Sequence, residues 1–167
     1  MSPGPMPKSG GDAVIVSETL NGPFQNEAIA SARRVVIDQP VRAGGMGMGP
    51  DPFEVVAAAL GACTAQTLRM YVNDRQWPVH RIRVAVSTSP APETGRVRFE
   101  RTITCEGELS DAQRTELVAA AERSPVNSVL NGSDVATRFG PIGDPVEEAR
   151  QARISHWIML HQALRAS

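Results

Sequence analysis

The sequence has little of what several classes of protein require. It contains only two cysteines among 167 residues, Cys63 and Cys105, and their wide separation excludes the disulfide framework of a small secreted protein. The three histidines and two cysteines show no spacing typical of a metal site. Lysine and arginine number 17 against 18 acidic residues, a net charge of −1. This balance produces no field that would attract nucleic acid or an anionic membrane, so neither is an expected partner.

Targeting patterns are scarce as well. No segment combines a basic start, an apolar stretch and a small-residue cleavage site, as a secretory signal peptide does. The longest apolar run, from Val55 to Val72, contains Gln66 and Arg69 and falls short of a clean membrane span. We therefore expect a soluble, cytoplasmic protein.

What is present divides the chain into three segments. Residues 1–12 are rich in Pro, Gly and Ser and are predicted to be a flexible leader, because they offer almost nothing to bury. Residues 13–143 are predicted to form a single domain, for which a hydrophobic content of 41% is sufficient. Residues 144–167 begin with a helix-start signal and carry an apolar stripe, which predicts a C-terminal helical extension.

The first half of the domain is predicted to contain two strands and one long helix. The strands cover residues 13–20 and 33–38, and a glycine-rich loop over 42–52 follows them. The helix is predicted to run from Pro52 to about Asn73, with Asp51 as its N-cap and Glu54 as its capping-box acid. Its apolar residues occupy nearly the whole circumference, so we expect other structure around it, a second subunit included.

The second half is predicted to continue with a hairpin and two helices. Residues 80–89 alternate in polarity and a second strand follows at 97–105, which predicts an antiparallel hairpin whose apolar face is interrupted by Arg101. Ser110 and Gln113 predict a capping box at the start of the next helix. Ser124 is predicted to be the N-cap of a short helix that begins at Pro125. A last strand is predicted over 133–140.

The residue with the clearest chemical potential is Cys63, inside the longest apolar run. Spacing alone is compatible with a small core residue and with a reactive thiol held in a pocket. A reactive cysteine needs a thiolate, and an apolar environment opposes ionisation, so a cation must be supplied nearby. The helix dipole gives little help, because Cys63 lies about three turns into the helix.

The stretch "GPDPFEVVAAALGACTAQTLRMYVNDRQWPV" resembles the OsmC-like family, which includes the organic hydroperoxide resistance proteins. The likeness extends less densely from Leu20 to Gly140, and includes "FERTITCEGELSDAQRTEL" and "ERSPVNSVL". The resemblance implies an α/β (α+β) OsmC-like fold, with antiparallel sheets wrapped around long central helices in an intertwined homodimer. It implies no metal and no organic cofactor.

The resemblance also assigns roles to the cysteines. In the family's peroxidatic members a thiolate attacks an organic hydroperoxide, and a second cysteine then forms a disulfide that dithiols reduce. Cys63 matches the attacking cysteine, but Ser124 stands where the second cysteine belongs, and a hydroxyl cannot form a disulfide. Cys105 lies on the apolar side of a predicted strand and is interpreted as a core residue. A sulfenic acid on Cys63 would therefore need an external thiol or dithiol to resolve it.

An activating arginine from an early loop, paired with a carboxylate, is a further implication of the resemblance. By position the candidates are Arg33, Arg34 and Arg42, of which we select Arg42. Glu54 is the candidate carboxylate, although it also fits the capping box of its own helix. It lies nine residues before Cys63, on the order of 13 Å along the axis and half a turn out of phase. Glu54 could therefore reach the thiol only after a break in the helix or from another subunit.

These inferences predict an organic hydroperoxide reductase of OsmC type, a thiol-dependent peroxidase with Cys63 as its nucleophile. Its expected partners are a second copy of the chain, an organic hydroperoxide and an external thiol or dithiol. Phe53, Leu60 and Met70 are expected to line the pocket. The alternative is a non-catalytic module that binds an apolar small molecule at the dimer interface, which Ser124 and Phe53 favour.

Overall fold

The computed structural model describes residues 14–30, 33–92 and 94–131 of the chain. The described residues form two compact units, one ending at Asp51 and the other beginning at Pro52. The predicted leader, the strand predicted over 133–140 and the C-terminal helical extension lie outside the described residues. The predicted domain bounds therefore stay a prediction.

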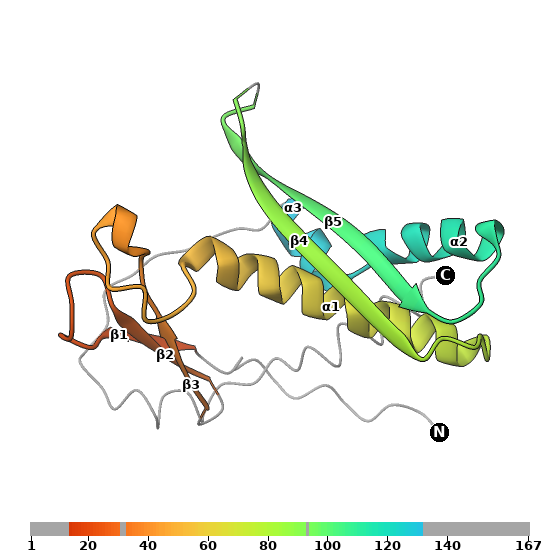
Figure 1. Ribbon diagram of the computed structural model, residues 1–167, viewed down its shortest axis with the longest axis horizontal. Coiled ribbons are helices and arrows are strands. Elements are labelled where there is room, and N and C mark those ends of the chain that lie inside the picture. The colour runs from red at the N-terminus through yellow and green to blue at the C-terminus, as the bar shows by residue number, and fades with distance from the viewer. Residues whose placement is uncertain (1–13, 31–32, 93, 132–167) are drawn as a thin grey trace, which may run out of the picture. The chain divides into compact units, whose positions relative to one another are not determined.

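The first unit is a three-stranded antiparallel sheet (Figure 1). β1 (Ile15–Glu18) pairs with β2 (Asn26–Ala30), and β2 pairs with β3 (Arg33–Ile37). β1 and β3 confirm the two predicted strands. The central strand β2 is missing from the sequence-based prediction, because its residues include only one large apolar side chain, Ile29.

A buried carboxylate organises the glycine-rich loop that follows β3. The loop begins with η1 (Val41–Ala43), a short 3₁₀ helix. Asp38 accepts hydrogen bonds at Oδ2 from the backbone N–H groups of Met46 and Met48, both at 3.2 Å. Its Oδ1 accepts a third from the N–H of Gln39, at 2.8 Å. One buried acid thus satisfies three backbone donors, which fixes the course of the loop.

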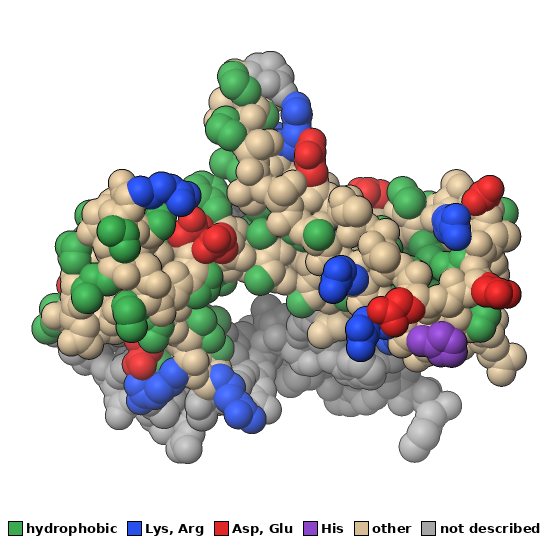
Figure 2. Space-filling model, in the orientation of Figure 1, with side chains coloured by type: hydrophobic (Ala, Val, Ile, Leu, Met, Phe, Trp, Pro, Cys, Tyr) green, Lys and Arg blue, Asp and Glu red, His purple; other side chains and the backbone are tan. Residues whose placement is uncertain are grey.

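This unit leaves many apolar side chains uncovered. Figure 2 shows hydrophobic side chains scattered over its visible face. The large exposed ones are Val14, Val16, Leu20, Phe24, Val35, Val36, Val41, Met46 and Met48. So many exposed apolar side chains on a small sheet are typical of a surface that another part of a protein covers.

The second unit is built on one long helix, α1 (Pro52–Asp74), which confirms the predicted helix. A hairpin of β4 (Arg81–Ala91) and β5 (Arg96–Glu106) packs across α1, and its tip extends beyond the helix (Figure 1). α2 (Asp111–Glu122) and α3 (Pro125–Asn131) also pack against α1. Antiparallel strands packed with helices confirm the predicted α+β class.

The register of the hairpin explains which of its faces meets α1. The cross-strand pairs on the inner face are Ile82 with Cys105, Val84 with Ile103, and Val86 with Arg101. The apolar members are half-buried, as the alternating pattern predicts. The third pair brings a charged side chain to this apolar face.

The core of the second unit lies where α1, α2 and the hairpin meet. Its buried members are Leu68, Tyr71, Val72, Val79, Leu117, Ala120 and Ala121, and the half-buried residues packed on them are Trp77, Ile82, Ile103, Cys105 and Leu109. Burying one leucine or valine contributes about 1.5–3 kcal/mol, so this cluster supplies much of the stability of the unit. Cys105 belongs to it, in agreement with its interpretation as a core residue.

The N-terminus of α2 forms the hydrogen bonds that its sequence predicts. Ser110 Oγ accepts a hydrogen bond from the N–H of Gln113 at 3.2 Å, and the N–H of Ser110 donates to Gln113 Oε1 at 2.8 Å. This is the reciprocal capping box that the sequence predicts. It fixes where α2 begins, and therefore where its C-terminal end meets α1.

Among the described helices, only α1 is long and apolar enough to cross a membrane by length and composition. The core helix of a soluble protein meets the same criterion, and α1 packs against the hairpin and both shorter helices. Its apolar character is therefore weak evidence for a membrane span.

Candidate functional site

Cys63 lies in the middle of α1 and is 2% exposed. The buried face of the helix around it also includes Leu60, Thr64 and Thr67. Thr67 Oγ1 donates a hydrogen bond to the carbonyl oxygen of Cys63, at 2.9 Å. The cysteine is thus enclosed within its own chain, on a face that also carries two buried hydroxyl groups.

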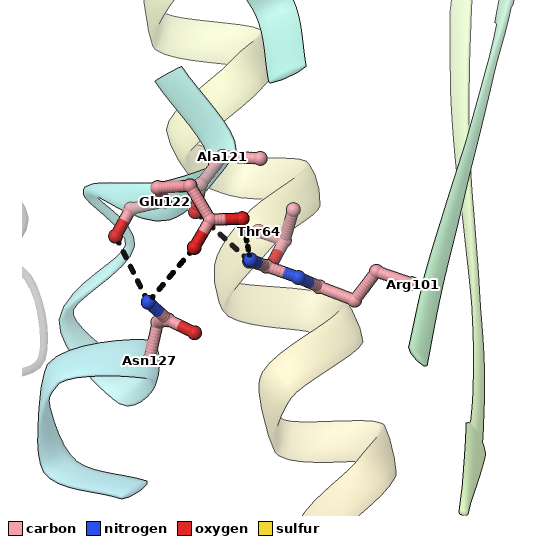
Figure 3. Close-up of polar contacts among 5 residues, drawn as sticks. All are labelled: Thr64, Arg101, Ala121, Glu122 and Asn127. Carbon is pink, nitrogen blue, oxygen red and sulfur yellow. Dashed lines mark hydrogen bonds and ion pairs between the residues drawn. The ribbon is translucent and has the colours of Figure 1, made fainter. Parts of the chain in front are cut away.

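Arg101 brings a guanidinium group to the residue next to Cys63. It extends from β5, and its Nη1 donates to Thr64 Oγ1 at 3.2 Å and to the carbonyl oxygen of Ala121 at 2.9 Å (Figure 3). Its Nη2 forms an ion pair with Glu122 Oε1 at 2.6 Å. The Arg101 side chain is 11% exposed, whereas that of Glu122 is 62% exposed. A largely buried cation therefore lies within hydrogen-bond reach of the segment that carries the cysteine.

Asn127 extends these contacts to α3. Its Nδ2 donates to the backbone carbonyl of Glu122 at 3.0 Å and to Glu122 Oε2 at 3.3 Å (Figure 3). We call the five residues Thr64, Arg101, Ala121, Glu122 and Asn127 the Arg101 network. The network joins α1, β5, α2 and α3 through hydrogen bonds and one ion pair.

Sequence reasoning did not select Arg101 as a functional residue. The signal in the sequence is the interruption of an otherwise apolar strand face by one arginine. A charged side chain on such a face is costly unless it is paired and hydrogen-bonded. An inward arginine on an apolar face therefore predicts partners on the elements packed against it, here Thr64 and Glu122.

A cavity of about 540 Å³ adjoins the network. Its lining consists of Leu60, Arg96, Val97, Phe99, Arg101, Ile103, Val118, Ala121, Glu122, Asn127, Leu130 and Asn131. Leu60 and Cys63 are three positions apart, and side chains at this spacing on a helix are neighbours, about 5–6 Å between Cβ atoms. The volume is within the range of small-molecule sites. Cys63 itself is not part of the lining.

The three residues expected to line a pocket lie in different environments. Leu60 is buried and lines this cavity. Phe53 is 54% exposed and Met70 is half-buried, and neither belongs to the lining of this cavity. A role for Phe53 and Met70 in a substrate pocket stays a prediction.

The predicted cation and carboxylate lie on separate elements. Arg42 is exposed in η1 of the first unit, and Arg33 and Arg34 are exposed in β3, where Arg34 pairs with Glu27. Glu54 lies in the first turn of α1 and lines a second cavity, of about 280 Å³. The arginines belong to one unit and the cysteine to the other, so their pairing stays a prediction.

Ser124 has the position of an N-cap but not its hydrogen bond. The prediction that its side chain caps α3 is wrong, because the N–H of Asn127 donates to the backbone carbonyl of Ser124 instead, at 3.0 Å. Ser124 is fully buried, and within the described ranges its Oγ has no hydrogen-bond partner. A buried hydroxyl without a partner is costly, so it marks a point where the structure is not optimised for stability.

Cys105 differs from a reactive cysteine in its electrostatics. Burial raises the pKa of the Cys105 thiol, and the positive charge of Arg69 offsets part of that increase. Arg69 itself donates to the carbonyl oxygens of Val79 and His80, at 2.7 and 3.2 Å. A raised pKa leaves less thiolate at neutral pH, which makes Cys105 a poor nucleophile.

Within residues 14–30, 33–92 and 94–131, no group of three or more His, Cys, Asp or Glu side chains is placed to hold a metal ion.

Sequence comparison identifies one family. The family described as "OsmC-like protein" matches residues 45–138, which is more than half of the chain and includes Cys63, the Arg101 network and Ser124. No curated protein matches the sequence.

Several solved structures have the same fold. An OsmC-like protein from Mycoplasma pneumoniae is 18% identical with a TM-score of 0.60, covering 72% of this chain and 88% of that one. An organic hydroperoxide resistance protein OsmC from Legionella pneumophila is 22% identical with a TM-score of 0.55, covering 72% and 90%. The organic hydroperoxide resistance protein OhrB of Bacillus subtilis is 21% identical with a TM-score of 0.51, covering 72% and 91%. At these identities the likeness shows the fold.

Loss of the Arg101 guanidinium is expected to destabilise the second unit. Arg101→Met removes hydrogen bonds to Thr64 and Ala121 from a largely buried position, and should lower the free energy of unfolding by about 1.5–3 kcal/mol. Arg81→Met is the matched control, because Arg81 forms an exposed pair with Glu106 at 3.4 Å and should contribute less than about 1 kcal/mol. Urea denaturation measures both. Equal losses in the two variants would contradict the structural role of Arg101.

The raised pKa of Cys105 predicts the pH dependence of its alkylation. In a Cys63→Ala variant Cys105 is the remaining thiol, and only its thiolate reacts with iodoacetamide. Because the folded protein holds its pKa above the ordinary value of 9.0, the alkylation rate should still be rising at that pH. The same variant unfolded in urea should show the midpoint of an ordinary thiol. A midpoint below pH 9.0 in the folded state would be incompatible with this assignment.

Proposed function

Because this chain belongs to the OsmC-like protein family, which includes organic hydroperoxide resistance proteins, we propose that it reduces organic hydroperoxides through Cys63. The observation that carries the proposal is the position of Cys63. It lies on the buried face of the central helix, next to a hydroxyl held by the Arg101 guanidinium. A nearby cation and restricted access of water are what a thiolate nucleophile for an apolar peroxide requires.

The proposed reaction has two stages. The Cys63 thiolate attacks the terminal oxygen of the hydroperoxide, the O–O bond breaks, and the alcohol leaves after it takes up a proton. Cys63 is thereby oxidised to a sulfenic acid. An external thiol then displaces water to form a mixed disulfide, and a second thiol releases Cys63 as thiolate together with a small disulfide.

The serine at position 124 is the reason why the proposed reaction needs an external thiol. It is fully buried at the start of α3, and α3 packs against α1, the helix of Cys63. Its hydroxyl cannot form a disulfide, and Cys105 is an unsuitable substitute because burial raises the pKa of its thiol. The reductant therefore comes from outside the chain in this proposal.

In this proposal, two sets of residues activate the Cys63 thiol. Arg101 is within hydrogen-bond reach of Thr64, which supports an electrostatic role in the second unit. Arg42 and Glu54 remain the proposed cation and carboxylate of the pair that the family resemblance implies. Their approach to Cys63 depends on the arrangement of the two units or on a second copy of the chain.

A homodimer is part of the proposal. Ala58, Ala59 and Ala62 are exposed on one side of α1, and a helix so rich in apolar residues is normally covered on all sides. The exposed apolar side chains of the first unit also favour a covering partner. We further propose a cytoplasmic location, where a reducing environment keeps a single reactive thiol available.

A second candidate function is binding of an apolar molecule without turnover. The 2% exposure of Cys63 favours it, because a peroxide reaches so enclosed a thiol less easily. Native mass spectrometry of the freshly purified protein distinguishes the two functions. A co-purifying apolar ligand that persists in a Cys63→Ala variant, with no loss of peroxide, supports binding alone.

The test of the proposed function is peroxide consumption. With cumene hydroperoxide and dithiothreitol, the wild-type protein should consume peroxide catalytically, and Cys63→Ala should reduce the rate to that of the buffer. Cys105→Ser is the matched control and should retain most of the activity, because Cys105 packs in the core. Equal activity of the wild-type protein and Cys63→Ala would refute the assignment.

A further inference from the structure

The C-terminal extension predicted over residues 144–167 lies beyond the family match, which ends at residue 138, so the family assigns it no role. The apolar stripe of this extension consists of Ile154, Trp157, Ile158 and Leu164. At about 100° per residue, these four positions fall within about 120° of the circumference of a helix. A helix of this kind gains most of its stability when another surface covers its apolar stripe. The extension therefore needs a surface to pack against.

The cavity of about 540 Å³ in the second unit presents apolar side chains to solvent. Val97, Val118 and Leu130 are 39%, 58% and 41% exposed, and they come from β5, α2 and α3. Phe99 and Ile103 are half-buried in the same lining. Exposed apolar side chains from three elements thus line one hollow, which is typical of a surface that binds another apolar surface.

The polar groups of the lining are largely engaged with one another. Arg101 and Glu122 form an ion pair at 2.6 Å, and Asn127 donates to Glu122 Oε2 at 3.3 Å. The third charged residue, Arg96, belongs to the last cross-strand pair, at the tip of the hairpin. An apolar occupant can fill the cavity without breaking these contacts, because it demands no hydrogen bonds of its own.

The described part of the chain ends beside this cavity. Its last two residues, Leu130 and Asn131, both belong to the lining. The connection over residues 132–143 can span at most about 40 Å, and a helix over residues 144–167 would be about 36 Å long. The extension is therefore long enough to return to the cavity at which the described chain ends.

We propose that the C-terminal extension forms a helix that packs its apolar stripe into this cavity of its own chain, with Trp157 at the centre of the contact. An amphipathic helix that binds an apolar groove contacts it through positions i, i+3 and i+4, which is the spacing of Ile154, Trp157 and Ile158. Tryptophan supplies the largest contact area of these residues. The contact covers Glu122, which is 62% exposed, and so removes water from its ion pair with Arg101.

Fluorine NMR of the full chain labelled with 5-fluorotryptophan tests the position of Trp157. The chain contains two tryptophans, Trp77 and Trp157, so two resonances are expected, and Trp157→Phe identifies the second. The resonance of an exposed fluorotryptophan shifts when H₂O is replaced by D₂O, whereas that of a buried one shifts much less. In the wild-type protein, Trp157 should show about half or less of the isotope shift that it shows in urea-unfolded protein.

Two adjacent positions of α2 supply a variant and its matched control. Val118→Glu adds a carboxylate to the lining and should raise the isotope shift of Trp157 to its value in the unfolded protein. Ala119→Glu adds the same charge at the next residue, which is exposed and outside the lining, and should leave the isotope shift unchanged. Leu130→Glu repeats the test from α3. The three substituted side chains are exposed, and circular dichroism verifies that each variant folds.

Four results would overturn the inference. The first is a wild-type protein in which Trp157 shows the isotope shift of the unfolded chain. The second is a protected Trp157 that neither Val118→Glu nor Leu130→Glu affects, because the extension would then pack on another surface. The third is an equal loss of protection in Val118→Glu and Ala119→Glu.

The fourth result identifies a different occupant. If labelled Val118→Glu protein regains protection of Trp157 when it is mixed with unlabelled wild-type protein, the cavity binds the extension of a second copy of the chain. None of these measurements involves Cys63, so their outcome is independent of the proposed function.

Discussion

The arrangement around Cys63 depends on the hydrogen bonds and the ion pair that the Arg101 guanidinium forms. It reaches from β5 into the packed side of the hairpin and binds α1 through Thr64 and α2 through Ala121 and Glu122. Asn127 adds α3 through its bonds to Glu122. A buried cation needs these partners, because an unpaired charge on an apolar face would cost several kcal/mol. The same requirement fixes how four elements pack beside the cysteine.

The environment of Cys63 combines two properties that oppose each other. Cys63 is 2% exposed, so water is largely excluded from it, whereas the Arg101 guanidinium brings a positive charge to the residue next to it. Ser124 adds a buried hydroxyl without a hydrogen-bond partner among the described residues. An unsatisfied buried hydroxyl costs stability, so packing alone does not account for a serine at this position.

Much of the fold follows from local signals in the sequence. α1 is predictable from its capping residues and apolar content, the β4–β5 hairpin from alternation, and α2 from the capping box of Ser110 and Gln113. β2 is not, because its pairing with β1 and β3 stabilises a segment with one large apolar residue. The failure of Ser124 as a cap has a similar origin, since the competing backbone hydrogen bond is visible only in the folded chain.

The candidate site was predictable only in part. The motif around Cys63 predicts a nucleophile, but the partners of Arg101 lie 20 to 37 positions away in the sequence, and no local pattern pairs them. In the sequence, Arg101 is recognisable only because it interrupts the alternation of apolar and polar residues along β5. The roles of Arg42 and Glu54 depend on long-range packing in the same way, which is why spacing alone leaves them open.

The most direct measurement is intact-mass analysis of the wild-type protein after brief exposure to an organic hydroperoxide in the presence of dimedone, which traps sulfenic acids. The account predicts one dimedone adduct per chain, located on Cys63 by peptide mapping and absent from Cys105. Unmodified protein, under conditions in which the peroxide oxidises a reference thiol protein, would contradict it and would return Cys63 to the role of a packed core residue.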